Sequence, residues 1–232
     1  MNAKCVCLIS TICLGLCPAS ALRADVIHSL VAANFNTAST RVGTYPPDAG
    51  TRFIEMAPGF SAWASGGQIR LTQGPGYGME RTGGVYAEIL KEAKFYQISF
   101  PRLKFPMLRP GVIIRDPVRS IQFSIDAKIP AGKDIVVYVA IEPPKDLMPE
   151  TPWGTRLVLG TLKGTDAFTT YMFKGEDVPE ETVTVFINYI RDLQLNGTTE
   201  MVGTLVFHIN PDGWAAGDGF LFDNVKLQIA GN

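Results

Sequence analysis

The segment from Arg119 to Ile129 alternates apolar and polar residues one by one, and this period of two constrains the fold more than any other feature of the sequence. Its apolar positions are Ile121, Phe123, Ile125, Ala127 and Ile129. Successive side chains of a β-strand point to opposite faces of a sheet. The pattern therefore predicts a strand with one buried face and one face in water.

Similar short runs, rich in β-branched and aromatic residues, continue along the chain. Asp134 to Glu142 (DIVVYVAIE) forms one of them, and clusters of Gly, Pro, Asn and Asp separate the runs. Further strands are expected at Phe53–Met56, Gln68–Thr72, Phe95–Phe100, Arg156–Leu162, Phe168–Phe173, Val183–Tyr189, Met201–Ile209 and Gly219–Ile229. About ten short strands of this kind predict an all-β, antiparallel sandwich or barrel.

The segment Tyr86 to Lys94 (YAEILKEAK) fits two interpretations. Its residues are good helix formers and would support a two-turn helix, while Val85 to Leu90 would also serve as a strand that enters a loop. No repeat or linker divides the chain, so we expect one domain over residues 25–232, with residues 25–52 packed more loosely.

The first 24 residues have the pattern of a secretory signal peptide. Lys4 precedes an apolar stretch of 13 residues, Cys5 to Cys17, and the small residues around Ala19, Ala21 and Ala24 fit signal-peptidase cleavage. The stretch is shorter than the roughly 18–20 residues of a membrane span. We therefore expect a secreted or periplasmic protein with no transmembrane segment.

All four cysteines (Cys5, Cys7, Cys13 and Cys17) lie in this segment, so the mature chain would contain none. A lipid anchor at Cys17 is the competing interpretation, but Leu16 stands where a small residue would be needed. An exported domain without disulfides has to be stabilised by the size of its core.

Composition argues against several classes of function. The chain has 21 Lys and Arg against 22 Asp and Glu, and a nucleic-acid-binding protein normally carries a basic excess. Only two histidines occur, His28 and His208, and no Gly-x-Ser-x-Gly motif is present, so the sequence offers no nucleophile with an adjacent base. We expect His208 to be a strand residue that is hydrogen-bonded at a sheet edge.

Carboxylates give no catalytic residue either. Glu176, Asp177, Glu180 and Glu181 form an acidic cluster interrupted by Pro179, which is typical of a solvated loop. Two carboxylates from distant strands could still form a glycosidase pair, so an enzyme remains an open alternative.

The second half of the chain resembles the galactose-binding-like jelly-roll domains, especially the carbohydrate-binding modules of secreted glycanases. The resemblance covers residues 94–229 and is carried mainly by Phe220 to Leu227 (FLFDNVKL), which matches a closing strand of the form aromatic-x-Asp-Asp/Asn-Val-x-Leu. It implies a jelly-roll sandwich, a polysaccharide or other glycan as partner, and no covalent chemistry.

The resemblance also implies a structural Ca²⁺ between the N-terminal strand and the closing strand. The matching positions are Asp223 and the Asn34-Phe35-Asn36 segment, in which Asn36 replaces the usual Glu. Because Ca²⁺ prefers six to eight oxygen ligands, this replacement weakens the expected site. Hydrogen bonds from Asp223 and Asn224 to a neighbouring loop are the alternative.

A sugar ring stacks its C–H surface on an exposed aromatic ring while amides and carboxylates bind its hydroxyls. Trp214, Trp153 and Trp63 lie in or near Gly- or Pro-rich segments, and Tyr77 lies beside a flexible loop, as does the weaker candidate Tyr45. Each Trp has the alternative role of a core plug at one end of the sandwich. The strand aromatics Tyr96, Tyr138, Phe123 and Phe207 are expected in the core.

Three hypotheses of function follow. The first is an exported, non-catalytic protein that binds a glycan through exposed aromatic residues. The second is a polysaccharide lyase or glycoside hydrolase on a similar sandwich. The third is a structural envelope or matrix protein, which predicts that Trp153 and Trp214 are buried.

Overall fold

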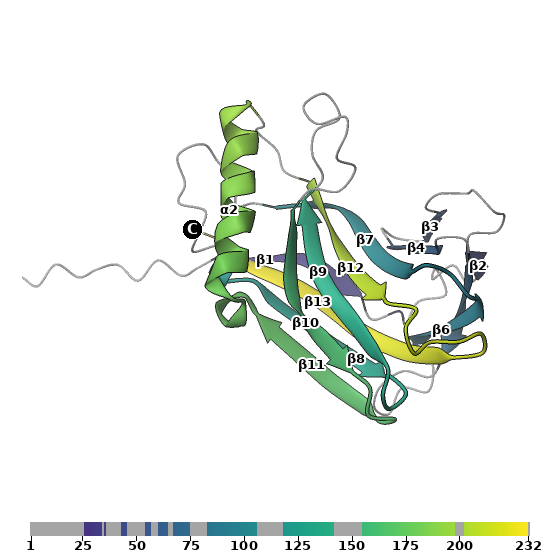
Figure 1. Ribbon diagram of the computed structural model, residues 1–232. Coiled ribbons are helices and arrows are strands. Elements are labelled where there is room, and N and C mark those ends of the chain that lie inside the picture. Colours follow the sequence, from purple (N-terminus) through teal and green to yellow (C-terminus); the bar gives the residue numbers. More distant parts are fainter. Residues whose placement is uncertain are drawn as a thin grey trace, which may run out of the picture.

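Two antiparallel sheets stack face to face in the computed structural model, which describes residues 26–33, 35, 43–45, 54–56, 60–64, 67–74, 83–105, 118–141, 155–197 and 202–231 (Figure 1). The seven-stranded sheet has the order β11 (Phe168–Lys174), β8 (Gln122–Lys128), β13 (Gly219–Gly231), β6 (Gly84–Lys91), β5 (Gln68–Gly74) and β2 (Gly43–Tyr45), with β1 (Val26–Ala33) also paired to β13. The six-stranded sheet has the order β10 (Arg156–Lys163), β9 (Asp134–Ile141), β12 (Val202–Ile209), β7 (Tyr96–Lys104), β4 (Phe60–Ala64) and β3 (Ile54–Met56).

The closing strand β13 runs through the middle of the seven-stranded sheet. One side pairs with β8, with an irregularity between Asp223 and Lys226. The other side pairs with β6 from Gly219 to Phe222 and with β1 from Val225 onward. The expectation that Phe220 to Leu227 lies in the packed sandwich is confirmed. Residues 26–33, the start of the segment expected to pack loosely, pair with β13 throughout.

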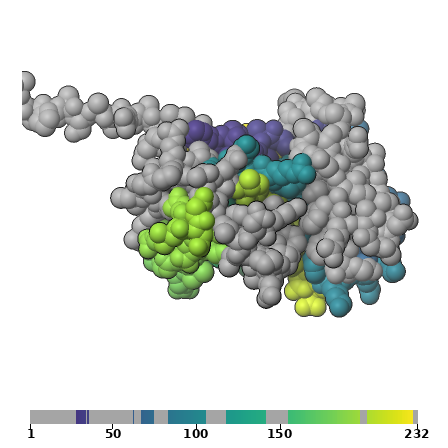
Figure 2. Space-filling model, turned by 90° about the horizontal axis from the view of Figure 1, so that it is seen from above, coloured from purple at the N-terminus to yellow at the C-terminus, as the bar shows by residue number. Residues whose placement is uncertain are grey.

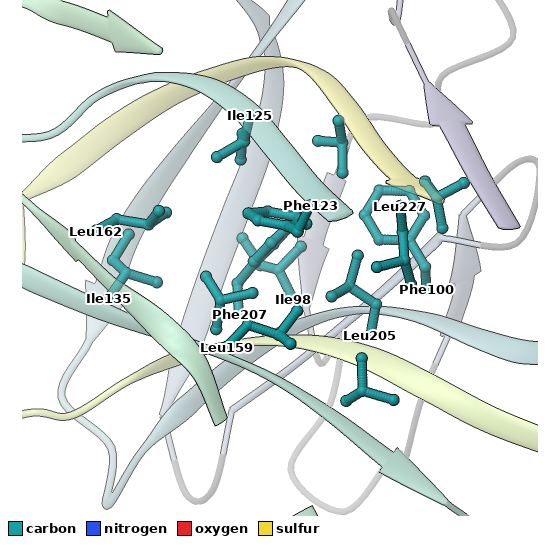
Figure 3. Close-up of a cluster of buried hydrophobic side chains, with 14 of the residues drawn as sticks. Ile98, Phe100, Phe123, Ile125, Ile135, Leu159, Leu162, Leu205, Phe207 and Leu227 are labelled. Atoms are coloured by element: carbon teal, nitrogen blue, oxygen red, sulfur yellow. The ribbon is translucent and has the colours of Figure 1, made fainter. Parts of the chain in front are cut away.

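Side chains from both sheets interleave to form one core (Figure 3). Phe123 of β8 and Phe222 of β13 meet Phe207 of β12, with ring centroids 5.9 Å and 6.2 Å apart. Phe207 also packs edge-on against Phe100 of β7. Fully buried aromatic rings of this size contribute most of the apolar area removed from water.

The predicted fold class is correct: an all-β, antiparallel sandwich. The path of the chain crosses between the sheets repeatedly, as it does in a jelly roll, because β8, β11 and β13 lie in one sheet and β9, β10 and β12 in the other. In the ambiguous segment, Gly84–Lys91 is a strand, and its buried residues Val85, Ala87 and Ile89 alternate with less buried ones.

The expected strand Val183–Tyr189 is wrong, because these residues lie in the helix α2 (Glu180–Leu195). Its buried residues Val183, Phe186, Ile190 and Leu193 recur at three- and four-residue spacing, which fits a helix and not a strand. The acidic residues Glu180 and Glu181 occupy the first turn, where they stabilise the positive end of the helix dipole. Burial on this helical period outweighs the strand preference of the β-branched residues.

The helix closes one side of the sandwich beside β10. Seen end-on in Figure 2, α2 (green) lies at one corner, and β1 (purple) lies along the far flank.

Arg119 stabilises the segment that leads into α2. Its guanidinium donates hydrogen bonds to the carbonyl oxygens of Gly175, Glu176 and Val178 and forms an ion pair with Glu180. The acidic cluster is therefore exposed, as expected, but it forms a 3₁₀ turn (Gly175–Asp177) and a helix start, not a loop.

The expected signal peptide, residues 1–24, lies outside the described residues. Among the residues that the structure does describe, no helix is both long and apolar enough to cross a membrane.

Candidate ligand-binding face

The six-stranded sheet carries a second layer of side chains on the face turned away from the core. In β9, Ile135, Val137 and Val139 belong to the core, so the alternating residues Val136, Tyr138 and Ala140 point to the opposite side. We call this side the outer face. From the registers of β7, β9, β10 and β12, its positions around Tyr138 are Gln97, Ser99, Val136, Tyr138, Ala140, Arg156, Val158, Thr204, Val206 and His208. Asp134 and Lys163, paired opposite each other, lie on the same side where β9 begins and β10 ends.

The middle of the outer face is buried, although it does not lie between the two sheets. Gln97, Ser99, Tyr138 and Thr204 expose between 1% and 4% of their surface. Burial of so many polar groups requires hydrogen-bond partners. The side-chain nitrogen Nε2 of Gln97 on β7 donates to the Tyr138 hydroxyl on β9 at 2.9 Å, across the intervening strand β12.

The prediction that Tyr138 is a buried core residue is confirmed, but Tyr138 lies with Ala140 and Val206 in a second, smaller cluster on the outer face. A period of two shows that a strand has two faces, but it does not show which of them faces the other sheet. Tyr96, Phe123 and Phe207 do lie in the core, as predicted. Burial raises the pKa of the Tyr138 hydroxyl, and the nearby positive charge of Arg156 opposes this shift, so the phenol is protonated at neutral pH.

His208 lies on β12, between β9 and β7, and so in the interior of the sheet. The expectation of an edge position is wrong, and its buried Nδ1 has no hydrogen-bond partner among the described residues. Its ring lies 6.2 Å from that of Tyr138 and 5.6 Å from that of Phe95. Burial lowers the pKa of His208, and the positive charge of Arg156 lowers it further, so the imidazole is neutral at pH 7.

The outer face opens to solvent at the edge strand β10. Arg156 and Val158 are exposed there, and Val158 lies directly opposite the buried Tyr138. The guanidinium carbon of Arg156 lies 4.9 Å from the centre of the Tyr138 ring, which is a cation–π contact. The Gln97–Tyr138 pair is buried behind the exposed Arg156.

Trp214, the first candidate for an exposed binding aromatic, is buried, with 5% of its surface exposed. Its indole Nε1 donates to the backbone oxygen of Asp134 at 3.3 Å, and its ring packs edge-on against Phe220. Lys133 lies over the ring and pairs with Asp218 at 2.7 Å. The expectation of exposure is therefore wrong, because Trp214 plugs one end of the sandwich, as the alternative role and the structural hypothesis both predicted.

The structure does not test whether the other aromatic candidates, Trp63, Trp153 and Tyr77, are exposed. Trp63 lies in β4, where its backbone is paired opposite Gln97. Trp153 and Tyr77 lie outside the described residues. Their assignment as ligand-binding residues stays a prediction.

The calcium candidate Asp223 lies on the other sheet and is 2% exposed. It is directly opposite Asp126 of β8, which is 7% exposed, and so two buried carboxylates face each other. Asp126 accepts hydrogen bonds from Thr170 at 2.5 Å and from Asn224 at 2.8 Å. The Asp223 carboxylate accepts the backbone N–H of Asn224 at 2.7 Å.

One residue of the segment expected to share the calcium with Asp223 is described. Phe35 is buried and packs edge-on against Phe222, the neighbour of Asp223, at 5.5 Å. Asn36 itself lies outside the described residues, and no cluster of three or more His, Cys, Asp or Glu side chains occurs within the part of the chain that is described. Two carboxylates suit a hard cation but fall short of its usual ligand number, so calcium at Asp223 and Asn36 stays a prediction.

Several solved structures resemble this chain. A family 11 module from Clostridium thermocellum, in complex with a β-1,3-1,4-mixed-linked tetrasaccharide, is 12% identical, with a TM-score of 0.45, and the match covers 81% of this chain and 96% of that one. A family 30 module of a Clostridium thermocellum cellulosomal cellulase is 8% identical over 87% and 96% of the two chains, with a TM-score of 0.44. A tandem family 22 pair from Paenibacillus barcinonensis is 12% identical over 90% of this chain and 48% of that one, with a TM-score of 0.46.

All three are carbohydrate-binding modules. Modules of this kind have galactose-binding-like jelly-roll folds, the class that the closing-strand motif resembles. No family model and no curated protein matches the sequence. Function is carried by sites on a fold and not by the fold itself, so no residue role passes from these modules to this chain.

Proposed function

We propose that this protein binds a glycan on the outer face of the six-stranded sheet, without catalysing a reaction on it. The observation that carries the proposal is the combination of the hydrogen-bonded Gln97–Tyr138 pair with solvent access at Arg156 and Val158. Amide, phenol and guanidinium groups are typical partners of sugar hydroxyls. Of these groups, the guanidinium of Arg156 lies at the surface, while the Gln97–Tyr138 pair lies buried behind it.

This proposal assigns glycan binding to residues other than the exposed tryptophans that the sequence predicted. Trp214 is buried at one end of the sandwich, so the contacts are assigned to the outer face and to strands β9, β10 and β12. The absence of catalysis is part of the proposal, as are export by the N-terminal signal and a location in the periplasm or outside the cell.

A glycan screen of the full chain by affinity gel electrophoresis tests the binding. The position of the site is tested by amide hydrogen exchange with the bound oligosaccharide. We expect added protection on β9, β10 and β12, and unchanged exchange on β8 and β11 of the other sheet. Protection confined to the seven-stranded sheet, or a negative screen, would overturn the proposal.

The same glycans separate binding from catalysis. We expect no new reducing ends and no unsaturated products after prolonged incubation with the protein. Release of either would favour the lyase or hydrolase hypothesis.

The burial of Trp214 also favours a structural envelope or matrix protein, which is therefore the second candidate. This candidate predicts that the full chain retains a protein from its own envelope fraction and binds no glycan. The two candidates thus give opposite results in the glycan screen.

A further inference from the structure

The charged groups of the outer face around Tyr138 have the same sign. The ten positions named above are polar without charge or apolar, apart from Arg156 and the titratable His208. The acidic residue Asp134 lies on the same side of β9, but at the far end of the strand from Ala140 and opposite Lys163 of β10. Sites for neutral sugars commonly use carboxylates as acceptors for hydroxyl protons, and the positions around Tyr138 offer none.

Arg156 differs from the other basic residues with charged contacts. Arg70 pairs with Glu88, Arg119 with Glu180, and Lys133 with Asp218. Arg156 contacts the Tyr138 ring, and within the described ranges no carboxylate forms an ion pair with it. Its guanidinium carries five N–H donors in a fork that matches carboxylate and sulfate oxygens.

The neighbours of Arg156 suit an acceptor-rich ligand. The chain as a whole has a formal net charge of −1, so the positive character is local. His208 lies beside Tyr138, and its buried Nδ1 has no hydrogen-bond partner in the described part of the chain. Binding of an anion nearby would favour a proton on this nitrogen and so add a second charged donor.

We propose that the outer face selects glycans that carry a carboxylate or a sulfate group, and that Arg156 is the residue that contacts this group. The inference rests on the proposed function, because it names the class of glycan for that same site. The contact is non-covalent, and its specificity comes from the charge-assisted hydrogen bonds of the guanidinium.

A matched pair of ligands isolates the charge. Polygalacturonate and its methyl ester have the same sugar ring and linkage, but only the acid is charged. We expect the full chain to bind the acid about tenfold or more tightly than the ester in low salt, the size of one charge-assisted contact. A carrageenan and an alginate distinguish sulfate from carboxylate, and xylan and mixed-linked β-glucan serve as neutral glycans.

Variants then assign the effect to one residue. Arg156→Gln should abolish the preference for the acid, and Arg156→Lys should retain part of it because it keeps the charge but loses the fork. Arg70→Gln on the other sheet removes one positive charge from the chain at a paired site and should leave the preference unchanged. Circular dichroism and thermal melting confirm that each variant is folded.

The outcomes separate the two proposals. Equal binding of acid and ester by the wild-type chain, or a preference that persists in Arg156→Gln, overturns the inference about charge and leaves glycan binding in place. An equal loss in Arg70→Gln also overturns it, since general attraction to a polyanion would then explain the preference. No binding of any glycan overturns both.

Discussion

Gln97 and Tyr138 are joined by a hydrogen bond that spans a whole strand. The amide of Gln97 starts on β7 and the phenol of Tyr138 on β9, and the 2.9 Å contact passes over β12, which lies between them. Both residues are almost completely buried, at 3% and 2% exposure. Neither group can exchange its partner for water without a change in the structure around it.

The first prediction concerns this pair. Tyr138→Phe leaves the Gln97 amide without its acceptor, and we expect a loss of about 1–3 kcal/mol in the free energy of unfolding. The double variant Gln97→Leu with Tyr138→Phe removes both polar groups and should lose less than the sum of the single variants. Urea denaturation of the four chains measures the coupling energy, and strictly additive losses would contradict the pairing.

The second prediction is a pH dependence from His208. Its pKa is lower in the folded protein than in the unfolded chain, so the unfolded state binds more protons below about pH 6.5. Stability should therefore be complete above pH 6.5 and should decrease as the pH falls toward the folded pKa, by at most about 1.4 kcal/mol per pH unit. His208→Gln should flatten this slope, while His28→Gln serves as the control. An unchanged slope in His208→Gln would exclude His208 as its source.

The third prediction concerns Trp214 as a structural plug. Trp214→Ala removes a buried ring and its hydrogen bond to Asp134, and we expect a loss of about 3–5 kcal/mol. Trp214→Phe should lose less, and Met172→Ala, at a side chain with 67% exposure, should change stability by less than about 0.5 kcal/mol. Glycan affinity of Trp214→Phe, measured well below its melting temperature, should equal that of the wild type. A loss of glycan affinity in Trp214→Phe without a loss of stability would show that Trp214 belongs to the binding site.

The fourth prediction concerns calcium at Asp223 and Asn36. If the ion binds the folded chain, calcium at one hundred times its dissociation constant stabilises the protein by about 2.7 kcal/mol. We expect calcium to raise the melting temperature and a chelator to lower it, and Asp223→Asn should abolish this response. Glu176→Gln changes an exposed acid and is the control. Identical melting curves with calcium and with chelator would contradict calcium binding at this site.

Strand positions were predictable because burial on one face leaves a period of two. β8 shows this, since its core residues alternate with polar ones in the sequence as they do in the structure. α2 was missed because its β-branched residues, such as Val183 and Val185, resemble a strand locally. The sequence signal for a helix was the three- and four-residue spacing of Val183, Phe186, Ile190 and Leu193. The strand preference of the β-branched residues between them made this spacing hard to recognise.

The site was less predictable than the fold, because a face is defined by pairing and not by sequence. Gln97 and Tyr138 are 41 residues apart, and only the order of β7, β12 and β9 brings them together. Tyr138 was correctly expected to be buried, but alternation is the same on either face of a sheet, so it did not show that Tyr138 belongs to the second cluster on the outer face. Trp214 was assigned to the surface for its Gly- and Pro-rich surroundings, although that loop folds back over the end of the sandwich.

The position of β13 sets an order of events during synthesis. β1 is the first described strand to be made, and its only strand partner among the described residues is the last one, so β1 waits unpaired for nearly the whole time of translation. Contacts so distant along the chain form slowly. A nascent chain halted before Gly219 would lack the common neighbour of β1, β6 and β8, and would expose the unpaired edges of all three strands to other chains.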